Sequence, residues 1–74
     1  MNAQDYRIAI AKLGMSQRRA ARFFEAGQAT GPRWAKDGPP AAVAMMLKLM
    51  IALHVRPDWV DFWLGRRKDN DSGA

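Results

Sequence analysis

The chain has 74 residues, no cysteine and a formal net charge of +5. This length allows one domain with a thin core, and without cysteine neither a disulfide framework nor a thiolate metal site is available. The positive excess lies in residues 1–36, which hold seven Lys or Arg against two Asp or Glu, whereas residues 37–74 hold five of each. Charge placed in this way favours a polyanionic partner, although a solvated basic surface gives the same count.

We do not expect a secretion signal in the N-terminal residues, because they lack a basic region followed by an apolar run. The longest apolar stretch, residues 41–53, is interrupted by Lys48 and is too short to span a bilayer. We therefore expect a cytoplasmic protein with no membrane partner.

The first helix is predicted over residues 4–13. Tyr6, Ile10 and Leu13 recur at i, i+4 and i+7, the spacing of one apolar stripe of an amphipathic helix. Gly14 follows the stripe and suits the left-handed conformation common just beyond a helix end.

The second helix is predicted over residues 17–24, with the side chain of Ser16 as its N-cap. One face is apolar and carries Ala20, Phe23 and Phe24. The rest of the surface is basic and carries Arg18, Arg19 and Arg22.

Residues 27–38, GQATGPRWAKDG, are harder to assign because a proline in a helix interior costs about 3 kcal/mol. If a helix begins at Gly27, Pro32 lies in its second turn and removes a hydrogen bond. If Thr30 is the N-cap, Pro32 falls in the first turn, where proline is tolerated. The second alternative is favoured and predicts a short third helix over residues 31–36.

A fourth helix is predicted over residues 40–54, with Pro40 in its first turn. It is apolar nearly all round, so most of its sides must be buried. It is either the central helix or part of an interface with a second subunit.

Three aromatic residues, Trp59, Phe62 and Trp63, recur at i, i+3 and i+4 and predict a short fifth helix before Gly65. They form either a dimer interface or a cap on the core. Residues 66–74 are polar and are predicted to be a disordered tail. The expected fold is all-α, a compact bundle of four to five short helices in one domain over residues 1–65.

Residues 15–50 resemble the helix-turn-helix domains of the lambda-repressor-like (Cro and xenobiotic-response-element) family. They are most similar to small bacterial or phage-type regulators with the patterns S-Q-x-x-A-A-R-x-F, T-x-x-R-W and P-x-A-V-A-x-x-L-x-L-M. The resemblance implies that Gln17 lies near a phosphate and that Ala21 lies where the two motif helices cross. It also implies that Trp34 packs the recognition helix onto the core, with the outer side of residues 27–33 facing the major groove.

The chain departs from the family pattern at three positions. Glu25 stands where the family usually has a glycine with positive φ. A positive φ costs a non-glycine residue about 1 kcal/mol, unless Gly27 takes over the turn and shifts it. Gly31 replaces a β-branched apolar residue, so we expect a thinner contact between the motif helices. Pro32 removes one helical N–H group.

The resemblance and the charge together predict a small transcription regulator that binds double-stranded DNA sequence-specifically, with repression as the expected sense. A domain this small contacts too few bases alone, so a homodimer is expected. The predicted DNA contacts are Gln17, Arg18, Arg19, Arg22, Gln28, Thr30, Arg33 and Lys36. The predicted packing residues of the motif are Ala21, Phe24 and Trp34.

Roles among these residues differ. Arg33 is the best candidate for a base contact because a guanidinium can pair bidentately with guanine. The three arginines of the second helix are expected at phosphates. Gln28 and Thr30 can bind bases or phosphate, or only cap the helix.

The alternative function is a protein-binding adaptor or inhibitor that keeps this fold, which the Gly31-Pro32 pair in the recognition segment favours. No catalytic set is present, so we do not expect an enzyme. His54 is the sole histidine and has no neighbouring ligands, so no metal, cofactor or small-molecule ligand is expected.

Overall fold

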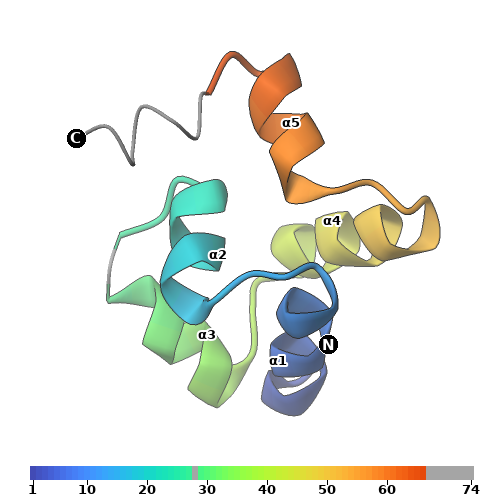
Figure 1. Cartoon of the computed structure of the whole chain (residues 1–74). Coiled ribbons are helices and arrows are strands. Elements are labelled where there is room, and N and C mark those ends of the chain that lie inside the picture. Colours follow the sequence, from blue (N-terminus) through green and yellow to red (C-terminus); the bar gives the residue numbers. More distant parts are fainter. Residues whose placement is uncertain (28, 67–74) are drawn as a thin grey trace.

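The computed structural model describes residues 1–27 and 29–66, and these contain five helices and no strand (Figure 1). The helices are α1 (Ala3–Lys12), α2 (Gln17–Phe23), α3 (Thr30–Asp37), α4 (Ala41–Ala52) and α5 (Pro57–Trp63). The predicted all-α class is confirmed. No helix in the described part of the chain is both long and apolar enough to cross a membrane.

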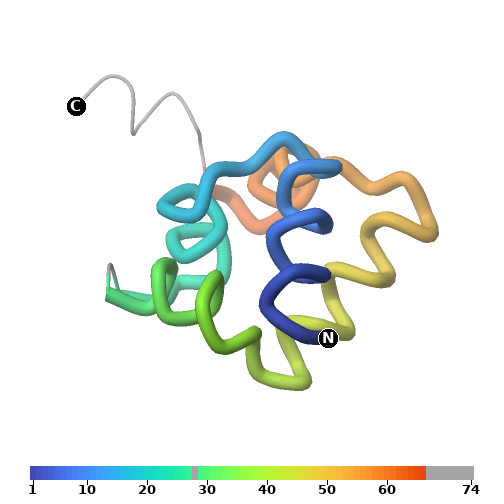
Figure 2. Tube along the Cα trace, turned by 90° about the horizontal axis from the view of Figure 1, so that it is seen from below, coloured from blue at the N-terminus to red at the C-terminus, as the bar shows by residue number. Residues whose placement is uncertain are grey.

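Helix α1 lies at the centre of the bundle. It packs against α2 and α3 on one side and against α4 on the other (Figure 2). Tyr6 on α1 is fully buried, as is Leu47 on α4, and the ring of Tyr6 meets the edge of Trp34 on α3 at 6.0 Å between centroids. Burial raises the pKa of Tyr6 above its ordinary value.

Helix α4 is less buried than its apolar sequence predicts. Its buried stripe consists of Ala44, Leu47 and Met50, and the opposite face is exposed, including Met45 (64%) and Leu49 (51%). The first alternative, that α4 is the central helix, is therefore wrong, because α1 and not α4 lies between its neighbours in the bundle. The second alternative, that part of α4 meets a second subunit, stays a prediction. Pro40 is the N-cap of α4 and not a first-turn residue.

Local hydrogen bonds fix where the first two helices begin. The side chain of Asn2 accepts from the amide of Asp5 at 2.7 Å, and Ser16 Oγ accepts from the amide of Arg19 at 3.0 Å. Both are N-caps, and the second confirms the prediction for Ser16.

Four helices end in the same way, with a left-handed residue just beyond the C-cap. These residues are Gly14 (φ 75°), Glu25 (φ 57°), His54 (φ 56°) and Gly65 (φ 78°). The predicted role of Gly14 is confirmed. His54 lies beyond the end of α4, which stops two residues earlier than predicted.

Helix α3 begins at Thr30, and its N-cap position is Ala29, which makes no side-chain cap hydrogen bond. Thr30 as the N-cap is therefore wrong. Pro32 is the third residue of the helix, so the prediction that it lies in the first turn is confirmed.

The boundary of the predicted tail needs one correction. Arg66 is half-buried and its guanidinium contacts α2, so the packed region extends one residue beyond the expected domain. The rest of that tail, residues 67–74, lies outside the described residues.

Candidate nucleic-acid interface

A six-residue connection, residues 24–29, joins α2 to α3. Glu25 has φ 57°, the left-handed conformation expected there from the sequence pattern, and Gly27 does not take over the turn. Two backbone hydrogen bonds close the turn, from the amide of Glu25 to the carbonyl of Arg22 at 2.9 Å and from that of Ala26 to Ala21 at 2.8 Å. The chain thus adopts the left-handed turn and bears its conformational cost.

The two helices approach each other closely at Gly31. A Cβ atom added there would lie 2.8 Å from the carbonyl oxygen of Gln17 and 3.5 Å from Cβ of Ala21. The expected position of Ala21 at this crossing is confirmed. The expected thin contact is wrong, because the backbone of α3 moves in and fills the space that a side chain would occupy.

Trp34 fixes the rotation of α3 about its own axis. It is 8% exposed and packs edge-on against Tyr6 and, at 6.1 Å, against the half-buried Phe24. The predicted packing of Trp34 and Phe24 is therefore confirmed. Because Trp34 points inward, the neighbouring Arg33 and Lys36 are exposed.

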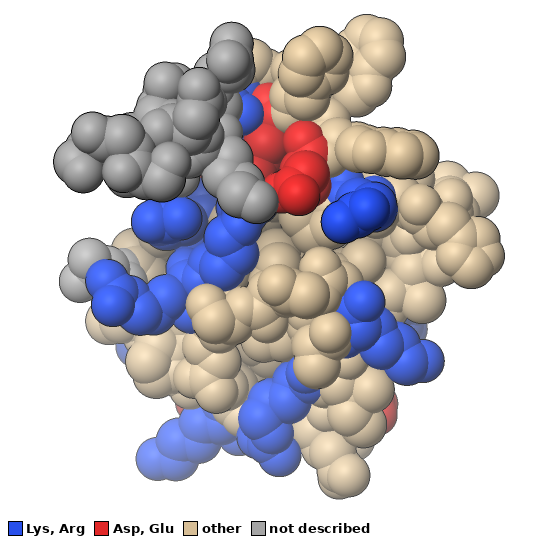
Figure 3. Space-filling model, viewed as in Figure 1, with Lys and Arg blue, Asp and Glu red and all other residues tan. Residues whose placement is uncertain are grey.

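The outer surface of α2 and α3 carries most of the predicted DNA-binding side chains. Those exposed there are Gln17, Arg18, Arg22, Arg33 and Lys36. Thr30 is half-buried at the start of α3, and Gln28 lies outside the described residues. Figure 3 shows blue basic side chains spread across this side of the molecule, with the acidic atoms in view gathered mainly where α5 meets α2.

Arg19 does not belong to this surface. Its Nη2 atom lies 2.7 Å from Asp61 Oδ2 and 3.4 Å from Asp58 Oδ1, and its side chain is 21% exposed. Since α5 supplies two carboxylates to this guanidinium, we remove Arg19 from the predicted phosphate contacts and assign it to the packing of α5 on α2.

Arg7 is a second arginine with a structural contact. Its guanidinium on α1 donates a hydrogen bond to the carbonyl of Ala35 near the end of α3. This bond tethers α3 to α1, and a cation near a helix C-terminus is favourable. No spacing in the sequence indicated the contact, because the two residues are 28 positions apart.

Asp61 and Arg66 were also missed. Asp61 is buried, and its carboxylate accepts a hydrogen bond from Arg19 and forms an ion pair with Arg66, whose Nη2 atom lies 2.9 Å from Oδ1. In the sequence Asp61 looked like an ordinary charge near a helix start, and Arg66 looked like the first residue of the tail. The left-handed Gly65 turns the chain back toward α2, and only the spacing of Gly65 after the helix hinted at this turn.

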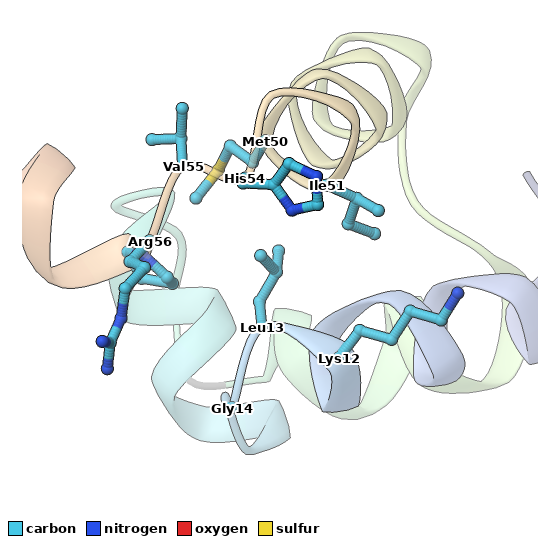
Figure 4. A pocket seen from close by; sticks show the side chains of 9 residues that line it. Lys12, Leu13, Gly14, Met50, Ile51, His54, Val55 and Arg56 are labelled. Atoms are coloured by element: carbon cyan, nitrogen blue, oxygen red, sulfur yellow. The ribbon is translucent and has the colours of Figure 1, made fainter.

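A surface pocket of about 640 Å³ lies between the ends of α1 and α4 (Figure 4). Leu13, Met50 and Ile51 form apolar walls, and the Arg56 side chain points away from the opening. The helix C-termini around it favour cations, whereas nearby Lys12 favours anions, so the walls specify no ligand charge.

Within residues 1–27 and 29–66, no three His, Asp or Glu side chains are grouped as metal ligands. Comparison of the chain with models of protein families, with curated proteins and with solved structures found no match.

Proposed function

We propose that α2 and α3 form a helix-turn-helix motif with which the protein binds duplex DNA sequence-specifically. In this proposal the protein is a small cytoplasmic transcription regulator that represses its target genes. The observation that carries the proposal is the pairing of an anchored α3 with an exposed basic surface. Trp34 is buried while Arg33 and Lys36 beside it are exposed. An α-helix such as α3 is about 10–12 Å in diameter with its side chains and so fits the major groove, which is about 12 Å wide.

The roles of the side chains follow from their positions on the two helices. Arg33 projects from the middle of α3 and is assigned to a base edge, where its forked guanidinium matches the two acceptors of guanine. Arg18 and Gln17 lie at the start of α2 and are assigned to phosphates, as is Lys36 near the end of α3.

The protein is proposed to act as a homodimer that meets through α5. Trp59, Phe62 and Trp63 are 57%, 72% and 82% exposed, so they do not cap the core. With aromatic side chains of about 150–250 Å² each, they expose roughly 400 Å², about half of what each partner gives a standard interface. Helix α5 has no basic residue, so two positively charged copies meet there with least repulsion.

The test is a titration of the protein against duplex DNA at several salt concentrations. If Arg18, Arg22 and Lys36 neutralise about three phosphates, log K should fall with log salt with a slope of roughly −3 per subunit. The variant Arg18→Gln should reduce the magnitude of this slope by about one. A flat response, or no binding at low salt, contradicts the proposal and favours the protein-binding adaptor, for which the exposed aromatic side chains of α5 are the supporting observation.

A further inference from the structure

The C-terminal end of α2 is completed by a side chain from the other end of the chain. The last four carbonyl groups of a helix have no partner within it. Backbone amides of the turn satisfy three of them in α2, with N···O distances of 3.1, 2.8 and 2.9 Å at the carbonyls of Ala20, Ala21 and Arg22. The fourth, the carbonyl of Phe23, accepts from Nη1 of Arg66 at 2.7 Å, 43 residues further along.

Several contacts hold the Arg66 guanidinium in this position. Its Nη2 atom lies 2.9 Å from Oδ1 of Asp61, a carboxylate that is only 8% exposed. Its Cζ atom lies over the ring of Phe23, 5.0 Å from the centroid. Nη1 also lies 3.4 Å from Oε2 of Glu25. The planar fork of arginine suits this set of partners, and the point charge of lysine does not.

Glu25, which follows the C-cap of α2, has the left-handed conformation although it is not a glycine. Arg66 contacts the chain on both sides of Phe24, at the Phe23 carbonyl and at the Glu25 carboxylate. The first contact holds the backbone at the last residue of α2, directly before the turn, and the second reaches the side chain of Glu25, which is 75% exposed.

We propose that Arg66 is a positioning residue for the α2–α3 turn: it fixes the end of α2 and so replaces the stabilisation that a glycine at position 25 would provide. The direction in which α3 leaves the turn then depends on Arg66, although Arg66 itself is not assigned to DNA. The effect on the turn is independent of the proposed function, and only its consequence for DNA binding rests on that function.

Amide hydrogen exchange, followed by NMR, tests the effect on the turn. In Arg66→Ala the amide of Ala26, which closes the turn, should exchange about tenfold faster relative to the amide of Leu47 in the core. Arg66→Lys should behave in the same way, which keeps the test usable if the alanine variant unfolds. Arg56→Ala is the matched control, because Arg56 is an exposed arginine that also flanks α5.

Rescue separates positioning from a general loss of packing. Adding Glu25→Gly to Arg66→Ala should return the exchange of Ala26 to within about twofold of the wild-type rate, because glycine adopts the left-handed conformation without support. Unchanged exchange in Arg66→Ala and Arg66→Lys, or no rescue by Glu25→Gly, overturns the proposal.

The same variants separate this inference from the proposed function. In a duplex DNA titration, Arg66→Ala should lower affinity about three- to tenfold with an unchanged salt slope, and Glu25→Gly should restore it. A reduced slope would make Arg66 a phosphate contact and overturn its positioning role. If the wild type does not bind DNA, the proposed function fails, whereas the exchange experiment still decides the role of Arg66.

Discussion

Gly31 is the position at which a single methyl group decides how closely α2 and α3 approach. Alanine stabilises a helix interior by about 1 kcal/mol over glycine, but its Cβ here would lie 2.8 Å from the backbone oxygen of Gln17. Overpacking of this kind costs about 1–3 kcal/mol and the gain in helix propensity offsets part of it, so we expect Gly31→Ala to destabilise the fold by up to about 2 kcal/mol. Thermal unfolding followed by circular dichroism measures this as a fall in Tm.

Gly27→Ala is the matched control for this prediction. A Cβ at Gly27 would have Thr30 Oγ1, at 4.0 Å, as its nearest neighbour, so the Gly27→Ala substitution should leave the Tm unchanged or raise it slightly. Equal Tm values for the two variants would show that the α2–α3 contact has room for a side chain.

Arg33 and Arg18 are both exposed arginines, but they are assigned different tasks. Arg33→Ala should cost about 1–3 kcal/mol on a selected site and much less on random DNA, because it removes a bidentate base contact. Arg18→Ala should weaken binding to both DNAs alike, since a phosphate contact carries no sequence information. Affinities measured on selected and random duplexes test this, and equal losses on both for Arg33→Ala would make Arg33 a phosphate contact.

At the scale of the helices, local signals predicted most of the fold. Apolar spacing, the Ser16 cap and the Gly14 turn depend on residues only a few positions apart. The position of Pro32 in the first turn of a helix could be predicted because proline is tolerated there. The interpretation failed where a contact joins distant segments. The Arg19–Asp61 pair cannot be predicted from spacing, because its members are 42 positions apart and either looks like an ordinary surface charge.

The wrong placement of α4 at the centre of the bundle has a different cause. Hydropathy indicates how apolar a helix is, but it does not indicate how much protein is available to cover it. In residues 1–27 and 29–66 there are four other helices, all of them shorter than α4, and α1 alone packs extensively on it. The apolar excess of α4 therefore stays at the surface, as does that of α5.

For the whole molecule, the arrangement places the proposed reading helix and the aromatic helix on different sides of α2. In Figure 1, α3 and α5 lie beyond opposite sides of α2. Asp61 of α5 is held by Arg19 of α2 through a 2.7 Å ion pair, so α5 is tied directly to the motif. Two copies that meet through α5 would present their α3 helices outward, and a spacing of about 34 Å would match successive major grooves.

This arrangement predicts a dimer that can be separated without unfolding the chain. The double change Phe62→Asp with Trp63→Asp replaces two side chains that are 72% and 82% exposed with two negative charges. It should therefore abolish self-association while the helical content is kept. Ile8→Asp is the matched control, because Ile8 is 48% exposed on α1, away from α5. Sedimentation at micromolar concentration should give a dimer for the wild type and for Ile8→Asp, and a monomer for the double variant. If the wild type sediments as a single 8.3 kDa chain throughout that range, α5 is not a self-association surface. That outcome favours the adaptor alternative, in which the aromatic side chains of α5 bind a different protein.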